Sequence, residues 1–216
     1  MRIVAVTDIH GKLEKVKRLA GGVLEEERPD LILIAGDITN FSGAEVARTV
    51  LEPLMALDVP ILAVHGNCDG RDVPELLEEL GISLHNKRKE VNGTGFVGVG
   101  GSNITPFNTI WELTEDEIME ILRKNYRPGG DIILSHAPPK DTKADRVHSG
   151  LHVGSTALRE FIEKNQPPLV VTGGHIHEAR SVDELGETII VNPGPLFRGV
   201  LCCYRLGRKG KSCEKH

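Results

Sequence analysis

Short runs of aliphatic, mostly β-branched residues recur along the chain, and they constrain its fold more than any other feature. The runs cover residues 3–6, 31–35, 61–64, 131–135, 169–172 and 188–191. Most lack an alternation of apolar and polar residues, which predicts strands buried on both faces of a sheet. Stretches with apolar residues at helical spacing lie between several of the runs, at 12–27, 43–57, 73–80, 114–124 and 155–164. This order predicts an α/β fold in which helices cover the sheets.

Length and composition limit the organisation of the chain and its partners. The 216 residues suffice for one large core, so we expect a single domain over 1–216, with a polar, frayed tail at roughly 207–216. A formal charge of -5 and 4% aromatic residues argue against an extended nucleic-acid surface. The first apolar stretch covers only residues 3–6, which is too short for a signal peptide or a membrane span. We therefore expect a cytoplasmic protein with no membrane partner.

Polar, ligand-type residues follow five of the predicted strands at the point where each strand ends. These segments read TDIHG from Thr7, GDITN from Gly36, HGNCD from His65, SHAPP from Ser135 and GGHIH from Gly173. In open α/β sheets, ligands bind beyond the carboxyl ends of the strands, so the five segments are expected to converge. Taken singly, an Asp or His beside glycine is commonly a turn former or a cap. Their occurrence in series favours a metal site instead.

The residue types in these segments are typical ligands of divalent metal ions. Strand alternation would place Asp8 and His10 on one side of the chain, and likewise His175 and His177. Carboxylates, imidazoles and an amide without a thiolate suit Mn²⁺, which we favour, or Fe²⁺, Zn²⁺ or Ni²⁺. The candidates suffice for two ions about 4 Å apart that share a carboxylate, for which we choose Asp37. The full candidate set is Asp8, His10, Asp37, Asn67, His136, His175 and His177.

The series DIHG, GDITN, GNCD, SHAPP and GGHIH resembles the calcineurin-like metallophosphoesterase superfamily, over roughly residues 1–195. The resemblance implies an α/β fold built as a four-layer α/β/β/α sandwich with mixed sheets. It also implies a first metal ion on Asp8, His10 and His177, a second on Asn67, His136 and His175, and Asp37 as the bridge. The implied reaction is attack of a metal-bridging hydroxide on the phosphorus of a small phosphodiester or phosphomonoester. The loop 141–155 and the segments 98–102 and 192–195 further resemble an archaeal and bacterial branch of predicted phosphoesterases.

One position departs from the pattern of the superfamily. Relatives usually read GNH followed by Asp or Glu, and their histidine donates to the phosphate or the departing oxygen, whereas this chain has Cys68. A thiol is a poor donor and carries no positive charge, so another residue takes this role or the leaving group departs unprotonated. In the loop 141–155 the first candidate acid is His152 and the second is His148, although either is also compatible with a solvated loop histidine.

The catalytic candidates are therefore Asp37, Asn67, His152 and Asp69, the last of which we expect to orient Asn67 or a ligand histidine.

Two further functions remain open beside a hydrolase of small phosphoesters. One is a nuclease, against which the missing basic surface argues. The other is a non-catalytic scaffold or interaction subunit, a role taken by some members of the superfamily that have lost ligand histidines. The expected partner is a small phosphoester, and a homo-oligomer is compatible with the sequence. The segment 103–111 is either a loop that covers the substrate, or an exposed loop or packed flap without function.

Overall fold

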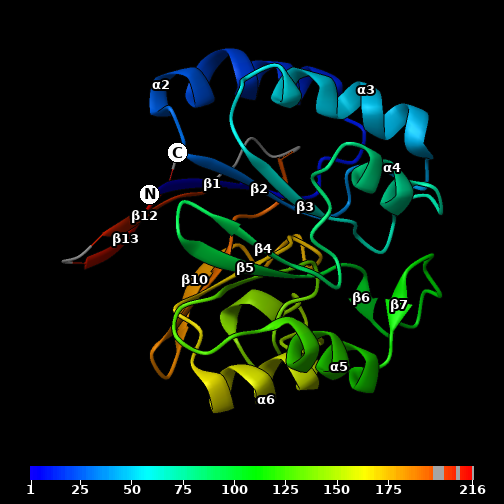
Figure 1. The fold of residues 1–216 in the computed structure, drawn as a ribbon. Coiled ribbons are helices and arrows are strands. Elements are labelled where there is room, and N and C mark those ends of the chain that lie inside the picture. The colour runs from blue at the N-terminus through cyan, green and yellow to red at the C-terminus, as the bar shows by residue number, and fades with distance from the viewer. Residues whose placement is uncertain (197–201, 208–209, 216) are drawn as a thin grey trace.

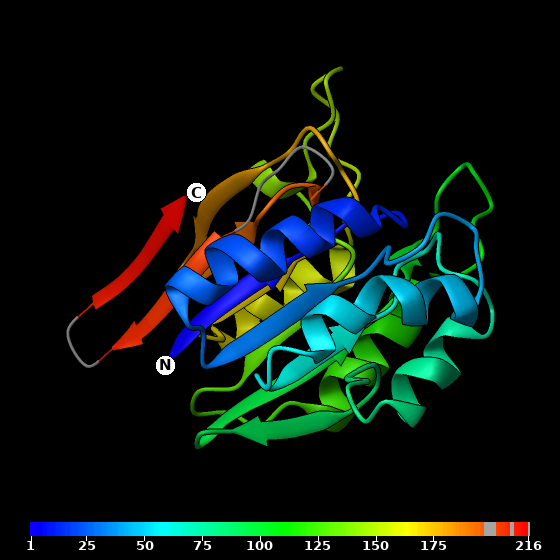
Figure 2. The same cartoon turned by 90° about the horizontal axis from the view of Figure 1, so that it is seen from above.

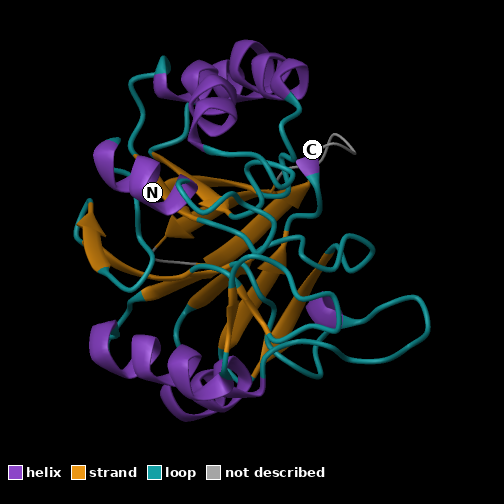
Figure 3. Cartoon of the chain, turned by 90° about the vertical axis from the view of Figure 1, so that its right-hand side faces the viewer, coloured by secondary structure: helices purple, strands orange, loops and turns teal. Residues whose placement is uncertain are grey.

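The computed structural model of the chain describes residues 1–196, 202–207 and 210–215. Two β-sheets are stacked face to face, and helices cover the outer face of each sheet (Figure 1). The view coloured by secondary structure shows the same order of helix, sheet, sheet and helix (Figure 3). The predicted α/β/β/α sandwich is therefore confirmed. Within the described part of the chain, no helix has both the length and the apolar character needed to cross a membrane.

The first sheet has the strand order β13-β12-β1-β2-β3. Its strands are β1 (Arg2–Val6), β2 (Leu31–Ala35), β3 (Ile61–Val64), β12 (Cys202–Gly207) and β13 (Gly210–Lys215). Strands β1, β2 and β3 are parallel, and β12 runs antiparallel to β1. The helices of this layer are α1 (Leu13–Leu19), which continues through a π-helical turn (Ala20–Leu24) into α2 (Glu25–Glu27), α3 (Ala44–Met55) and α4 (Val73–Glu79).

The second sheet has the strand order β10-β11-β9-β8-β5-β4. Its strands are β4 (Arg88–Val91), β5 (Thr94–Val99), β8 (Ile132–Ser135), β9 (Leu169–Thr172), β10 (Ser181–Leu185) and β11 (Thr188–Asn192). The four inner strands are parallel and the two edge strands are antiparallel, so both sheets are mixed. This layer also contains α5 (Glu115–Asn125), α6 (Thr156–Asn165), a 3-10 turn (Lys143–Asp145) and the short pair β6 (Ser102–Asn103) and β7 (Glu112–Leu113).

Alternate residues of the inner strands face different layers. In β1, Ile3 belongs to the core between the two sheets, whereas Val4 belongs to the core under α1 and α3. In β8, Leu134 faces the first sheet and Ile133 faces α5 and α6. The described residues thus form three stacked apolar cores. Burial on both faces explains why these strands read as continuous apolar runs in the sequence.

The C-terminal tail differs from the prediction of a frayed end. Residues Gly210–Lys215 form β13, which pairs with β12 and places Gly210 opposite Gly207. The resulting hairpin lies at the edge of the first sheet (Figure 2). An edge strand needs backbone partners on one side only and tolerates charged side chains, so a polar segment can extend the sheet. Residues 208–209 and 216 of the predicted tail lie outside the described residues.

Candidate metal centre

The candidate ligands lie beyond the carboxyl ends of parallel strands in both sheets. Four follow strands of the first sheet and three follow strands of the second: Asp8 and His10 after β1, Asp37 after β2, Asn67 after β3, His136 after β8, and His175 and His177 after β9. A hydrogen bond joins the two sets of loops, because the amide of Gly174 donates to Oγ1 of Thr7 at 2.9 Å. The predicted convergence of these segments at one edge of the sandwich is therefore present.

Left-handed backbone conformations place the ligands of the first sheet. The φ angles of Asp8, His10 and Asp37 are 48°, 47° and 49°. Residues other than glycine adopt this region rarely, and each instance costs roughly 1–3 kcal/mol that the surrounding structure must offset. Hydrogen bonds between the two loops hold it: the amide of Asp8 donates to the carbonyl of Gly36 at 3.1 Å, and that of His10 to Asp37 at 2.9 Å.

Strand alternation does not position either ligand pair, Asp8 with His10 or His175 with His177. Strand β1 ends at Val6 and β9 ends at Thr172, so both pairs lie in loops. Asp8 and His10 still meet because of the loop conformation. His175 and His177, which we expected to share a centre on this argument, lie in different clusters, as the family resemblance had implied.

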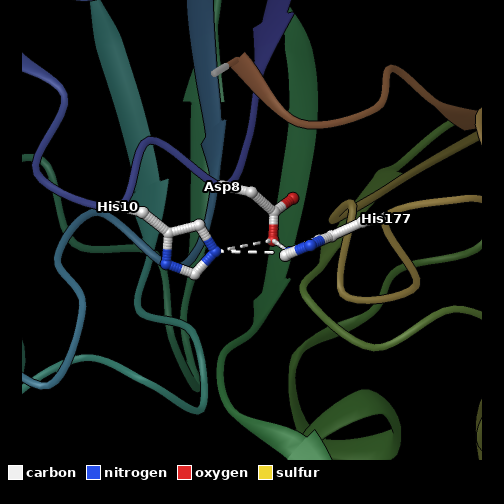
Figure 4. A group of neighbouring side chains, drawn as sticks. All are labelled: Asp8, His10 and His177. Carbon is white, nitrogen blue, oxygen red and sulfur yellow. Dashed lines mark hydrogen bonds and ion pairs between the residues drawn. The ribbon is translucent and has the colours of Figure 1, made fainter. Parts of the chain in front are cut away.

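The first cluster joins Asp8, His10 and His177 (Figure 4). Oδ1 of Asp8 lies 3.3 Å from Nε2 of His177 and 3.9 Å from Nε2 of His10. The same two ring nitrogens are 3.3 Å apart. Two imidazole nitrogens and one carboxylate oxygen therefore point at a common position, which a divalent cation would suit.

The carboxylate of Asp8 is fully buried. Burial would raise the pKa of Asp8, but the contact with His177 and the charges of His136 and His177 lower it, so that the net pKa is below its ordinary value. Oδ2 accepts a hydrogen bond from Oγ1 of Thr7 at 2.7 Å. Among the described residues, Oδ1 receives no well-formed hydrogen bond. A buried, ionised oxygen without a donor fits a metal ligand.

The second cluster joins Asn67, His136 and His175. Oδ1 of Asn67 lies 2.9 Å from Nε2 of His136 and 3.0 Å from Nδ1 of His175. Nδ1 of His136 lies 2.8 Å from the carbonyl oxygen of Ala35, so Nδ1 must carry the proton. In the tautomer with the proton at Nδ1, Nε2 of His136 and Oδ1 of Asn67 are both available as ligand atoms, and their positions suit two ligands of one cation.

Asp37 lies between the two clusters. Its Oδ2 is 3.8 Å from Nε2 of His10, and its Oδ1 is 3.5 Å from Nε2 of His136. Ligand atoms of Asp8, Asp37 and His136 also lie within 4.8 Å of one another. The amide of Cys68 donates to Oδ1 of Asp37 at 2.9 Å, which fixes the orientation of the carboxylate. One carboxylate oxygen for each cluster is the geometry that a shared ligand requires.

Glycines leave the space that these carboxylates occupy. A Cβ atom on Gly66 would lie 2.0 Å from Oδ1 of Asp37, and one on Gly174 would lie 2.1 Å from Oδ2 of Asp8. Both distances are far below van der Waals contact. Any side chain at either position would therefore displace a candidate ligand.

Asp69 connects the loops that carry Asp37 and Asn67. Its fully buried carboxylate accepts hydrogen bonds from the amides of Thr39 at 2.7 Å and Gly66 at 2.8 Å, and from the hydroxyl of Thr39 at 3.0 Å. Burial and the neighbouring charge of Asp37 raise the pKa of Asp69 to about 6, against the effect of these bonds. We expected Asp69 to orient the side chain of Asn67 or a histidine. Its recorded partners are instead backbone groups and Thr39, so it positions the loops.

Burial also determines the protonation of His175 and Cys68. It lowers the pKa of His175 to about 3, with a further contribution from His136, so the imidazole is neutral and able to bind a metal ion. Burial raises the pKa of the Cys68 thiol, and the negative charge of Asp37 raises it further. Cys68 is therefore a neutral thiol, which is a poor proton donor to a phosphoester.

The two candidate acids differ in their relation to this centre. His152 and His175 both line a cavity of about 520 Å³. His148 is exposed and does not line that cavity, and its amide donates to Glu178 at 3.1 Å. Only His152 of the two thus shares a cavity with a candidate metal ligand.

Asp145 is a site residue that the sequence analysis missed. Its carboxylate is fully buried, and Oδ1 lies 2.7 Å from Nδ1 of His152. The amides of Thr142 and Gly154 also donate to this carboxylate, at 2.9 and 3.0 Å. The partner at Nδ1 leaves Nε2 of His152 available for chemistry. The spacing of Thr142 and Asp145 is that of a cap and would have indicated a turn, but not the contact with His152.

Comparisons with known proteins place the chain in a family. The sequence matches the calcineurin-like phosphoesterase family over residues 1–179. Because the match covers most of the chain, the protein belongs to the calcineurin-like phosphoesterase family. The candidate ligands Asp8, His10, Asp37, Asn67, His136, His175 and His177 all fall within the matched residues.

Three relatives are similar to the chain over most of its length, and two of them are described as probable phosphodiesterases. The chain is 40% identical over 200 residues to the uncharacterized protein MJ1162 of Methanocaldococcus jannaschii, covering 90% of this chain and 88% of that protein. It is 25% identical over 224 residues to a probable glycerophosphodiester phosphodiesterase of Arcobacter nitrofigilis, covering 88% and 76%. It is 26% identical over 198 residues to a probable cyclic nucleotide phosphodiesterase of Synechococcus, covering 83% and 74%.

A solved structure supports the assignment of the fold. The protein TT1561 of Thermus thermophilus superposes with a TM-score of 0.76 at 21% sequence identity, covering 99% of this chain and 97% of that one. This likeness concerns the fold alone.

Proposed function

We propose that the protein is a dinuclear metal-dependent phosphoesterase that hydrolyses a small phosphodiester or phosphomonoester. The observation that carries the proposal is the position of Asp37, which offers one carboxylate oxygen to His10 of the first cluster and the other to His136 of the second. Asp8, His10 and His177 would hold one divalent ion. Asn67, His136 and His175 would hold the other. Manganese is the ion that we favour, since oxygen and nitrogen ligands without a thiolate suit it.

Two ions bound there would lower the pKa of a water molecule and offset the charge that develops on the phosphoryl group. Other residues of the chain hold the candidate ligands in position for this reaction. Asp69 holds together the loops that carry Asp37 and Asn67. The glycines at 66 and 174 allow the carboxylates of Asp37 and Asp8 to approach.

His152 would act as the proton donor to the leaving oxygen, in the place of the histidine that Cys68 replaces. In its protonated form Nδ1–H would donate to Asp145 and Nε2–H to the oxygen that departs from phosphorus. The hydrogen bond to the buried carboxylate of Asp145 would fix the orientation of the imidazole. After the transfer, His152 is neutral and the product leaves as an alcohol.

The substrate is expected to be a small molecule. Two relatives are named as probable phosphodiesterases, which favours a diester over a monoester. Their named substrates differ from one another, so the relatives support the reaction class and not one compound. A formal charge of -5 argues against an extended nucleic-acid surface and therefore against a nuclease.

Hydrolysis of bis(p-nitrophenyl) phosphate beside p-nitrophenyl phosphate, each with and without Mn²⁺, tests the proposal. We expect metal-dependent release of p-nitrophenolate, faster from the diester, and its loss in the variants Asp37→Asn and His136→Ala. If the purified protein releases no product with Mn²⁺, Fe²⁺, Zn²⁺ or Ni²⁺, the scaffold interpretation holds instead. A faster reaction with the monoester would assign the protein to the phosphomonoesterases.

A further inference from the structure

The cavity shared by His152 and His175 has a largely apolar wall. Ile104 and Phe107 contribute to it from the loop between β6 and β7, and Val147 and Val153 contribute from the loop that carries His152. Ile104 is 65% exposed and Phe107 is 80% exposed. Single exposed apolar residues are common on protein surfaces, but a set that lines one cavity beside a reactive centre indicates a binding site for an apolar group.

We infer that this cavity binds the leaving group of the substrate, and that this group is apolar and about the size of an aromatic ring. The inference rests on the proposed phosphoesterase function. His175 places one end of the cavity at the metal centre, where the phosphoryl group would lie. Apolar side chains such as Ile104, Phe107 and Val153 supply the larger share of the remaining lining, and an apolar group would cover them, while Glu115 and Lys140 add polar groups to it.

Because of the position of His152, we assign the cavity to the leaving group of the substrate and not to the group that stays on phosphorus. A proton donor must lie within hydrogen-bonding reach of the oxygen that departs. Since His152 lines the same cavity as Ile104 and Phe107, a leaving oxygen beside His152 would direct its carbon substituent along their apolar side chains.

Hydrogen bonds hold the wall in place. Oε1 of Glu112 accepts hydrogen bonds from the hydroxyls of Thr105 and Thr109, at 2.6 and 2.7 Å, and from the amide of Thr109 at 2.9 Å. Nδ2 of Asn103 donates to the carbonyl of Val153 at 3.1 Å and so joins the two sides of the cavity. A braced wall loses little conformational entropy when a ligand binds.

The same loop is attached to the metal centre. The amide of Ile110 donates to the carbonyl of Asn67 at 3.0 Å. The position of the apolar wall is therefore coupled to the position of a candidate ligand. This contact supports a role for residues 103–111 as a wall of the substrate site rather than as a segment without function.

Calorimetric titration of the manganese-loaded protein with benzylphosphonate and methylphosphonate tests the inference without requiring turnover. Both compounds carry the same anionic group, and neither can be hydrolysed at its carbon–phosphorus bond. Burial of the ring should make benzylphosphonate bind about tenfold more tightly. The variant Ile104→Ser should remove most of that preference. Leu151→Ser is the matched control, because Leu151 is 66% exposed and does not line the cavity.

Equal affinity for the two phosphonates, or an unchanged preference in Ile104→Ser, would overturn the inference and leave the proposed phosphoesterase function intact. If neither phosphonate binds to the manganese-loaded protein, the proposed function fails as well. Light scattering on the same proteins examines a second copy of the chain as the occupant. A wild-type dimer that Ile104→Ser converts to a monomer would assign the apolar wall to contact between copies and overturn the inference.

Discussion

Nδ1 of His152 lies 2.7 Å from Oδ1 of Asp145, which is fully buried in the loop that precedes α6. If this pair supplies the proton to the leaving oxygen, its importance should depend on the leaving group. The variant His152→Ala should lower kcat at least tenfold for a phenyl ester and much less for a p-nitrophenyl ester, because p-nitrophenolate departs readily without a proton. In Asp145→Asn the loss of kcat should likewise be greater for the phenyl ester than for the p-nitrophenyl ester, but smaller than in His152→Ala.

His148→Ala is the control for this comparison, since His148 is exposed and does not line the cavity. Steady-state kinetics with both esters provides the measurement. An equal loss of kcat for the two esters would assign His152 and Asp145 a structural role.

Asp37→Asn should reduce the number of tightly bound ions as well as the rate. The amide that replaces the carboxylate has one neutral oxygen, so it cannot bind one metal ion in each cluster with an anionic oxygen. We expect manganese content to fall from about two ions to about one per chain, and kcat to fall about 100-fold or more. Inductively coupled plasma spectrometry measures the metal content. Asp116→Asn, an exposed aspartate at the start of α5, is the matched control. Retention of two ions by the Asp37→Asn variant would rule out Asp37 as the bridge.

Removal of metal should lower the thermal stability of the protein. Nε2 of His136 and Oδ1 of Asn67, which lie 2.9 Å apart, suit two ligands of one cation, and Oδ1 of Asp8 is buried without a donor. A ligand present at 100 times its dissociation constant stabilises the native state by about 2.7 kcal/mol. For a chain of this size, that corresponds to a rise in Tm of about 5–10 °C on addition of Mn²⁺. Differential scanning calorimetry before and after treatment with EDTA measures it, and His136→Ala should show a much smaller rise.

The metal-free protein should lose stability in mild acid through His175. Its folded-state pKa is about 3, below the unfolded value of 6.5. The unfolded state therefore binds a proton as the pH falls below 6.5, whereas the folded state does not, so stability is present above pH 6.5 and is lost toward pH 3. Between pH 6.5 and pH 5 the loss should be about 1–2 kcal/mol. Urea unfolding at both pH values measures this difference, which His175→Gln should reduce. An identical pH dependence in that variant would assign the loss to other groups.

The strands of the fold and the residue types of the site could be predicted from the sequence, for a common physical reason. Strands β1, β2, β3, β8 and β9 are buried on both faces, so their sequences are continuous apolar runs. The edge strand β4 (Arg88–Val91) was not predicted, because it is partly exposed and carries Arg, Lys and Glu. Strand β13 (Gly210–Lys215) was mistaken for a frayed tail because its sequence is polar.

The sequence alone did not indicate which side chains of the site lie together. It depends on loop conformations such as the positive φ of Asp8 and Asp37, for which residues other than glycine give no clear sequence signal. His175 and His177, two positions apart, therefore face different clusters, which strand alternation could not indicate. The contact of His152 with Asp145 likewise depends on how one loop folds back on itself.

Glu112 provides a test of the apolar wall that leaves its apolar residues unchanged. Burial would raise the pKa of Glu112, but hydrogen bonds from Thr105 and Thr109 lower it to about 2, so the group is ionised at neutral pH. In Glu112→Gln the amide keeps the shape but offers a weaker acceptor, so the loop that presents Ile104 and Phe107 should loosen. We expect KM for a phenyl ester to rise about threefold to tenfold, while kcat and the manganese content stay unchanged. Glu120→Gln, an exposed residue of α5, is the control. A fall in kcat with KM unchanged would instead show that Glu112 acts on the chemical step, through the contact of Ile110 with Asn67.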